Sequence, residues 1–212
     1  MRQHNYWKMR QFQKVIIKVV LWGFGLFLLF LTLVLKKAID FNLLSGIISS
    51  LSIILGLALA LIEKKLWKTR IMRIPFLENY WTPVLEGRWE GTLERNGELH
   101  DFVLEIIQSF TSISCCTYSK HSKSSANATE ILYDDQLKHY QLIYYWNGTT
   151  TNTVGENRDS DRFDGFTILD IIIQSGTVTK LKGTYFTNRQ PQQTKGSINL
   201  SLKQNMLKKA FD

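Results

Sequence analysis

The residues best suited to hold a small charged ligand lie late in the chain, where Thr177–Arg189 reads TVTKLKGTYFTNR. In a strand, alternate side chains share a face, which groups Leu181, Tyr185, Thr187 and Arg189. An aromatic ring stacks on bases, a hydroxyl donates to phosphate oxygens, and a guanidinium pairs with phosphate through two parallel hydrogen bonds. This face becomes more polar towards its end, and it therefore predicts a site for a phosphorylated ligand that carries a base.

Three further residues join this candidate site. Asn188 lies within the polar end of the segment, and Lys195 opens the next strand nearby. Arg95 continues the inner face of a much earlier strand. A second interpretation stays open, in which these residues are ordinary polar caps at the rim of a barrel and Tyr185 packs inside it.

The chain lacks the patterns that accompany common catalytic chemistry. It contains no glycine-rich phosphate loop, G-x-S-x-G, C-x-x-C or H-E-x-x-H, and its four histidines are scattered. Cys115 and Cys116 are adjacent, so they form neither a disulfide framework nor a metal site, and in a strand they point to opposite faces. We therefore expect no enzyme activity, no metal site and no cofactor.

Charge is divided unevenly along the 212 residues. The formal net charge of the chain is +8, yet residues 1–83 hold 12 Lys/Arg against 3 Asp/Glu, and residues 84–212 hold 14 against 15. The second part is thus almost neutral. A fold that binds polymeric nucleic acid would carry its basic charge there, so this class of partner is disfavoured.

Two segments have the length and composition of membrane spans. Val15–Leu35 and Leu43–Ile62 are each about 20 residues long, enough to cross a hydrocarbon core about 30 Å thick. The link between them is short, so the spans form an antiparallel hairpin. Ser52, Gly56 and Ala60 recur every four residues in the second span. Such a stripe of small residues lets helices approach closely, either the first span of the same chain or another copy.

Basic residues on both sides of the hairpin predict its orientation. Residues 1–14 carry four Lys/Arg and residues 63–73 carry five, against two in the link at Lys36 and Lys37. Both termini should therefore face the cytoplasm. Residues 63–83 form a basic linker after the membrane part at 1–62, and its Trp67, Tyr80 and Trp81 are candidates for anchors at the headgroup level.

From residue 84 onward the hydrophobic period changes to two. In LEGRWEGTLER, Gly87, Trp89, Gly91 and Leu93 share one face, which is typical of a half-buried strand. Asn96-Gly97 is a strong hairpin signal. With this first strand over Leu85–Arg95, eight strands are predicted, the others at Asp101–Gln108, Thr111–Tyr118, Thr129–Asp134, Lys138–Asn147, Gly165–Ile173, Thr177–Thr187 and Thr194–Lys203. The predicted fold is a transmembrane two-helix hairpin followed by a small antiparallel all-β barrel of about eight strands over 84–205, with a tail at 206–212.

The whole arrangement resembles the two-transmembrane, β-strand-rich effectors that accompany cyclic-nucleotide synthases in bacterial antiphage signalling (CBASS). The resemblance rests on the two spans, on LEGRWEG at 85–91, on G-x-Y-F-T-N-R at 183–189 and on T-K-G at 194–196. It implies a multi-pass protein of the bacterial inner membrane whose cytoplasmic barrel binds a cyclic dinucleotide. Binding would make the hairpins self-associate and disrupt the membrane, which kills the infected cell.

Carried onto this chain, the family motifs match Trp89 in the first strand and a late group made of Gly183, Tyr185, Thr187, Asn188 and Arg189. Trp89 also fits a core position. Two alternatives stay open beside the effector: a membrane-tethered, lipocalin-like carrier or sensor of an apolar molecule, and a structural membrane protein whose barrel docks a partner.

Overall fold

The computed structural model describes residues 6–35, 40–69, 82–134, 137–150, 162–188, 193–204 and 206–211. The chain divides into two compact units. The helical unit comprises Arg10–Trp81 together with the short segment Ser109–Thr111. The barrel unit comprises Met1–Met9, Thr82–Gln108 and Ser112–Asp212.

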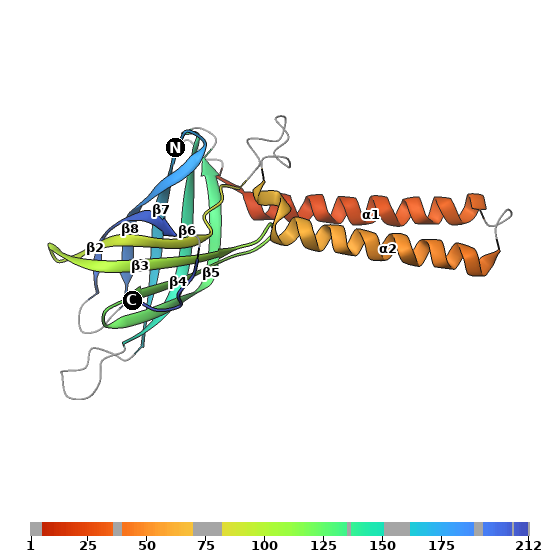
Figure 1. Cartoon of the computed structure of the whole chain (residues 1–212). Coiled ribbons are helices and arrows are strands. Elements are labelled where there is room, and N and C mark those ends of the chain that lie inside the picture. Colours follow the sequence, from red (N-terminus) through yellow and green to blue (C-terminus); the bar gives the residue numbers. More distant parts are fainter. Residues whose placement is uncertain are drawn as a thin grey trace. The chain divides into compact units, whose positions relative to one another are not determined.

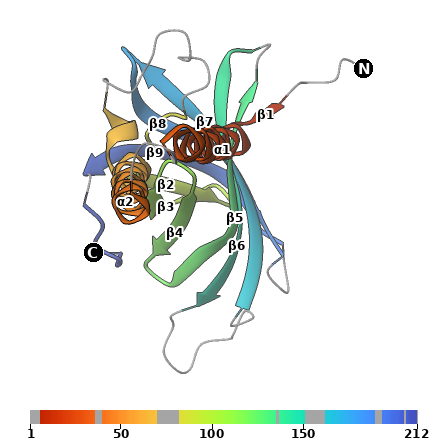
Figure 2. The ribbon, with the colours of Figure 1, turned by 90° about the vertical axis from the view of Figure 1, so that its right-hand side faces the viewer.

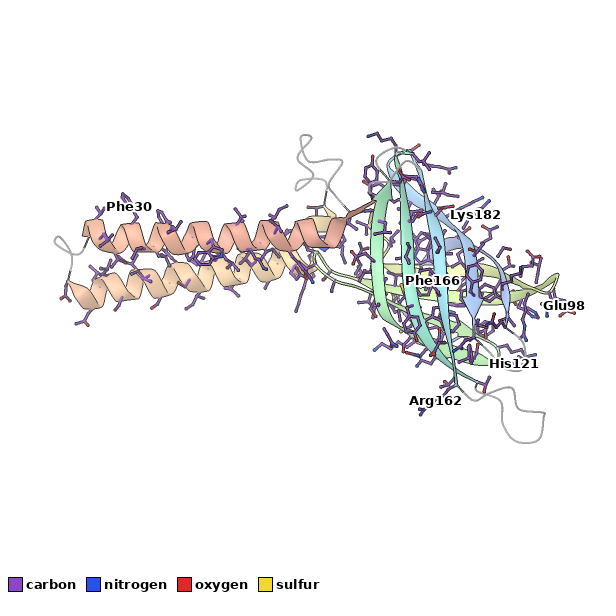
Figure 3. The ribbon with its side chains drawn as sticks, turned by 180° about the vertical axis from the view of Figure 1, so that it is seen from behind. Phe30, Glu98, His121, Arg162, Phe166 and Lys182 are labelled. Carbon is purple, nitrogen blue, oxygen red and sulfur yellow. The ribbon has the colours of Figure 1, made fainter. Side chains whose placement is uncertain are left out.

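The helical unit contains two long apolar helices, α1 (Met9–Leu35) and α2 (Phe41–Lys64). Figures 1 and 3 show them side by side. Within them, Lys14–Val34 and Asn42–Lys64 are long and apolar enough to cross a membrane. Large side chains such as Phe30, which is 64% exposed, project outward along both helices. Such exposure is unfavourable in water and suits contact with lipid. The predicted pair of N-terminal helices is confirmed.

The stripe of small residues on α2 remains uncovered. Ser52, Gly56 and Ala60 are all exposed, and a Cβ added at Gly56 would meet no atom within 4 Å. The Ser52 hydroxyl donates to the carbonyl of Ile48 at 2.9 Å, so it is satisfied within its own helix. In this structure α1 does not cover the stripe, and which helix packs against it stays a prediction.

The barrel unit is a closed antiparallel β-barrel (Figures 1 and 2). Each strand pairs with its neighbour in sequence, and the last strand pairs with the first of the eight, which closes the ring. The eight strands are β2 (Gly87–Arg95), β3 (Glu98–Gln108), β4 (Ile113–Ser119), β5 (Ser122–Asp134), β6 (His139–Thr150), β7 (Arg162–Gln174), β8 (Thr177–Thr187) and β9 (Lys195–Gln204). The predicted barrel and its strand number are confirmed.

Strand β5 begins seven residues earlier than the sequence suggests. Residues 122–128 read SKSSANA and contain no large apolar side chain, so the usual alternation is invisible there. β4 pairs only with Ser122–Ser125 of this long strand. The far end of β5 is paired instead with β1 (Tyr6–Lys8), a short strand that the sequence analysis did not predict.

The inner faces of the strands form one hydrophobic core. Trp89 and Gly91 face inward as predicted, and the Trp89 indole is fully buried and donates to the carbonyl of Leu85 at 2.8 Å. Burying one such large apolar side chain contributes about 1.5–3 kcal/mol. Its fully buried companions come from around the ring: Leu104, Ile106, Leu142, Leu169, Leu181 and Leu200.

A buried ion pair on the outer face of β2 and β3 holds the C-terminal tail. Arg88, only 1% exposed, donates to the Glu105 carboxylate at 3.1 Å. The same guanidinium donates to the carbonyls of Ala210 and Phe211, both at 2.6 Å. Glu105 in turn accepts from the backbone N–H of Lys208 at 2.7 Å. The tail is thus clamped by charge-assisted hydrogen bonds to a pair that it helps to bury.

The helical unit includes the connection between β3 and β4. The N–H of Phe110 donates to the backbone carbonyl of Glu63 at 2.9 Å, and the Thr111 hydroxyl donates to the Glu63 carboxylate at 2.7 Å. Trp67, in the short 3-10 helix Leu66–Lys68, packs its ring 6.3 Å from that of Phe110 and is 1% exposed. The expectation that Trp67 lies at the lipid headgroups is therefore wrong, because protein buries it. Tyr80 and Trp81 lie outside the described residues.

The two adjacent cysteines point to opposite faces of β4, as predicted. Cys115 faces the core and is 1% exposed, whereas Cys116 is partly exposed. Burial raises the pKa of the Cys115 thiol, which removes the reactive thiolate at neutral pH.

We expect a maleimide to label the native protein once. Cys116→Ser should abolish the rapid labelling measured by mass spectrometry, and Cys115→Ser should leave it intact. Rapid labelling of the Cys116→Ser variant would contradict the assignment.

Candidate functional site

The predicted site residues on β8 lie near one end of the barrel. This end, here called the Gly97 end, carries the β2–β3 turn at Asn96-Gly97 and the β4–β5 turn at Lys120-His121. Antiparallel order brings the last residues of β6 and β8 to the same end. Figure 3 shows Glu98 and His121 there, at the tips of two hairpins.

Strand β8 turns Tyr185 and Thr187 into the barrel. The two side chains are 4% and 9% exposed, and their neighbours Phe186 and Asn188 are exposed on the other face. The Tyr185 hydroxyl donates to the carbonyl of Glu94 at 3.3 Å. The Thr187 and Thr194 hydroxyls hydrogen bond at 2.7 Å, so the end of β8 and the start of β9 are joined by a hydroxyl pair. The predicted polarity of this inner face is present.

An aromatic pair lies next to Thr187 on the neighbouring strands. The rings of Trp146 in β6 and Phe163 in β7 meet edge to face, with centroids 5.7 Å apart. The Trp146 N–H donates to the Thr167 hydroxyl at 2.9 Å, which fixes the plane of the indole. Gly165 pairs directly with both Trp146 and Thr187, and a Cβ there would overlap the indole. The glycine thus creates the room in which the ring lies.

The wall made by β4 and β5 is lined with small hydroxyl side chains. Thr117 and Ser124 are directly paired, both buried, and hydrogen bonded through their hydroxyls. One step closer to the Gly97 end, the hydroxyls of Ser119 and Ser122 lie 2.7 Å apart. We call these four residues the β4–β5 hydroxyls.

The wall made by β2 and β3 adds two nitrogen-bearing side chains. Arg95 comes two residues after the inward Leu93 on β2, and His100 comes two residues before the inward Phe102 on β3. Both therefore belong to the inner face, on the side of the Gly97 end. Arg95 is partly exposed, and the His100 side chain is half exposed. A guanidinium near the rim can donate to an anion entering from this end.

Deeper in the barrel the polar groups are neutral. The Tyr144 hydroxyl is buried and has no hydrogen-bond partner of normal length in the described part of the chain. Burial raises the pKa of Tyr144 far above its usual range, only partly offset by the neighbouring Thr167 hydroxyl. This hydroxyl therefore stays protonated and can donate to a neighbouring group.

The structure brings some predicted residues together and separates others. Tyr185, Thr187 and Arg95 all face inward near the Gly97 end. Asn188 is exposed, and its amide is tied to the Asp164 carboxylate at 3.2 Å and to the Asp164 N–H at 2.6 Å. Lys195 is exposed beside the inward position of Gly196.

The remaining two predicted residues differ from these. Trp89 is a core residue with 0% exposure, which fits the core position that the sequence also allowed. Arg189 lies outside the described residues, so its part in the site stays a prediction.

The sequence analysis missed Trp146, Phe163 and the β4–β5 hydroxyls. Trp146 ends the run YQLIYYW, in which both faces are largely apolar and no clear alternation marks the inward one. Ser122 and Ser124 lie in the polar half of β5 that was not predicted as a strand. A usable signal was present in the glycines, since Gly148 and Gly165 each pair with an inward aromatic residue on the neighbouring strand.

Comparison with known families identifies the barrel. The model of a family described as Cap15, cyclic dinucleotide receptor domain, matches residues 80–202, more than half of the chain. The matched segment contains all eight barrel strands except the last two residues of β9. A search of curated proteins finds no match.

Proposed function

Since this chain belongs to the family of Cap15 cyclic dinucleotide receptor domains, we propose that its barrel is the sensor of a CBASS membrane effector and controls the two helices beside it in sequence. A cyclic dinucleotide from a phage-triggered synthase binds the barrel. Binding favours self-association of the helical hairpins, which disrupts the bacterial inner membrane and causes cell death. The barrel and both termini face the cytoplasm, where the messenger is made.

The observation that carries the proposal is the composition of the Gly97 end. Tyr185 and Thr187 lie near the edge-to-face pair of Trp146 and Phe163, and Arg95 lies near the rim. Aromatic rings suit bases, and hydroxyl and guanidinium donors suit phosphates. A small dianion needs only a few aimed donors, which fits a nearly neutral barrel. The alternative of an apolar carrier is disfavoured, because this end is rich in hydroxyls.

Self-association is supported by the helical unit. Large apolar side chains cover both helices, and the stripe of Ser52, Gly56 and Ala60 is left uncovered by α1. In lipid, such a stripe offers close backbone contact to another helix. The proposed mechanism requires that the ligand bind the assembled state more tightly than the dispersed state, because equal affinity would shift no population.

The proposal is tested with the full chain in vesicles of bacterial lipid. After addition of a cyclic dinucleotide, a cross-linking reagent should trap oligomers and an entrapped dye should be released, and linear dinucleotides should have neither effect.

Arg95→Ala should weaken binding about tenfold, measured by titration calorimetry in detergent, because a charge-assisted hydrogen bond is lost. Lys182→Ala, on the outer face of β8 (Figure 3), is the matched control and should bind normally. Intact vesicles and dispersed protein across a panel of cyclic dinucleotides would overturn the proposal.

A further inference from the structure

Two hydroxyl pairs of the barrel share the same local geometry. The first pair is Thr117 with Ser124, and the second is Thr187 with Thr194. In each pair the two hydroxyls hydrogen bond between neighbouring segments, and the two residues are seven positions apart in sequence. All four residues are buried. Both pairs lie towards the Gly97 end, because Thr117 and Ser124 precede and follow the β4–β5 turn and Thr187 ends β8. The barrel thus has two similar polar patches at one end.

The ring order places these two patches on opposite walls. One patch lies on β4 and β5, and the other lies on β8 and at the start of β9. In a closed ring of eight strands, moving from the first patch to the second takes four strand steps in either direction. The inward side chains of opposite strands in a barrel of this size face each other across the interior.

The two walls between the patches differ in chemistry. The β6–β7 wall carries the Trp146–Phe163 pair, two strand steps from each hydroxyl patch. The β2–β3 wall carries Arg95 and His100. A cyclic dinucleotide has two phosphodiesters on opposite sides of a ring and two bases between them. Its two phosphates, on opposite sides of the ring, therefore correspond to the two hydroxyl patches, and an aromatic wall lies between these patches on one side.

We propose that the β4–β5 hydroxyls form a second phosphate-contacting wall, opposite the one on β8 and β9, so that the barrel grips both phosphates of its ligand. This inference rests on the proposed binding of a cyclic dinucleotide and specifies the residues that read its second phosphate. They are Thr117, Ser119, Ser122 and Ser124.

The hydrogen-bond stoichiometry of the pairs supports this role. A bond between two hydroxyls uses one of their two protons, so one O–H of the Thr117–Ser124 pair remains able to donate. In the Thr117–Ser124 pair this donor is buried among apolar neighbours such as Leu104 and Cys115, where a charged acceptor is bound strongly. Serine and threonine add no net charge, so the two hydroxyl patches hold no cations that would repel each other.

The test compares two serines of one strand in the full chain in detergent. Ser124→Ala removes an inward hydroxyl, and Ser125→Ala removes an exposed one from the adjacent, outward position. Titration calorimetry should show about tenfold weaker binding of a cyclic dinucleotide to Ser124→Ala and unchanged binding to Ser125→Ala. A cyclic mononucleotide, with a single phosphate, should lose less affinity on the same substitution.

A second variant keeps the test sharp if burial makes Ser124→Ala unstable. Ser119 and Ser122 lie nearer the rim, and both are only partly buried. The double variant Ser119→Ala with Ser122→Ala should therefore fold, and it should weaken binding of the dinucleotide to a similar extent. Wild-type affinity in folded Ser124→Ala and in the double variant would refute the second wall and leave the proposed function standing. Absence of binding by the wild-type protein would instead refute the proposed function itself.

Discussion

Gly183→Val should strongly destabilise the barrel. A Cβ at this position would overlap the backbone carbonyl of Ile168 on β7 and approach the Cα of Leu169. Backbone atoms of a paired strand cannot rotate away as a side chain can, so relief requires that β7 and β8 separate. Overpacking a core costs about 1–3 kcal/mol even when side chains can yield, and we expect a loss at or above the top of that range. The measurement is thermal unfolding followed by tryptophan fluorescence in detergent.

The matched control for Gly183→Val is Thr184→Val. Thr184 is the next residue of β8, is exposed on the outer face, and pairs with Ile168 of β7. Valine is favoured in strands, so the melting temperature should stay within a few degrees of the wild type. A stable Gly183→Val protein that had lost only ligand binding would show that the glycine acts at the ligand and not in the pairing of the strands.

Arg88→Leu should destabilise the barrel by about 3–5 kcal/mol, because it leaves the buried Glu105 carboxylate without its ionic partner. It also removes two hydrogen bonds to the carbonyls of Ala210 and Phe211. The tail should detach, so carboxypeptidase should trim residues 206–212 from the variant faster than from the wild type. Denaturant unfolding in detergent measures the loss of stability.

Two further variants separate the buried charge from a general loss of packing. Arg162→Leu changes an exposed arginine at the start of β7 and should leave unfolding unchanged. Arg88→Leu combined with Glu105→Leu removes the buried carboxylate as well and leaves only Glu90, the other ionic partner of Arg88, which is 33% exposed, so its loss should be smaller than that of Arg88→Leu alone. If the double variant were the less stable of the two, the unpaired carboxylate would not be the source of the effect.

Much of the fold could be predicted because the chain follows simple periodic rules. The spans are long uninterrupted apolar segments, and the inward positions of β2 and β8 alternate with polar outward ones. Where both faces of a strand have the same character, the rule fails. The start of β5 is polar on both faces and was missed. β1 is three residues long and pairs with a strand more than a hundred residues away, which no local pattern reveals.

The candidate site could be predicted only along single strands. Tyr185 and Thr187 were found because their polarity stands out within one segment. Trp146 and the β4–β5 hydroxyls could be recognised as site residues only from the closed ring. Closure places β4 and β5 opposite β8 and β9, and it places β6 between these two walls. Tyr144 and Tyr145 show the difficulty, since they are adjacent and chemically identical, yet one is 1% exposed inside the barrel and the other is 40% exposed outside.

Closure of the eight-stranded ring also limits how copies of this protein can polymerise. In the described part of the chain, each strand from β2 to β9 pairs with a strand on both sides, and sheet edges remain only at β1 and in the stretch of β5 between its pairings with β4 and β1. Adding a strand of another molecule at any other place in the ring would require the barrel to be broken first. The proposed self-association of the hairpins would therefore rest mainly on contacts between side chains and little on added strands.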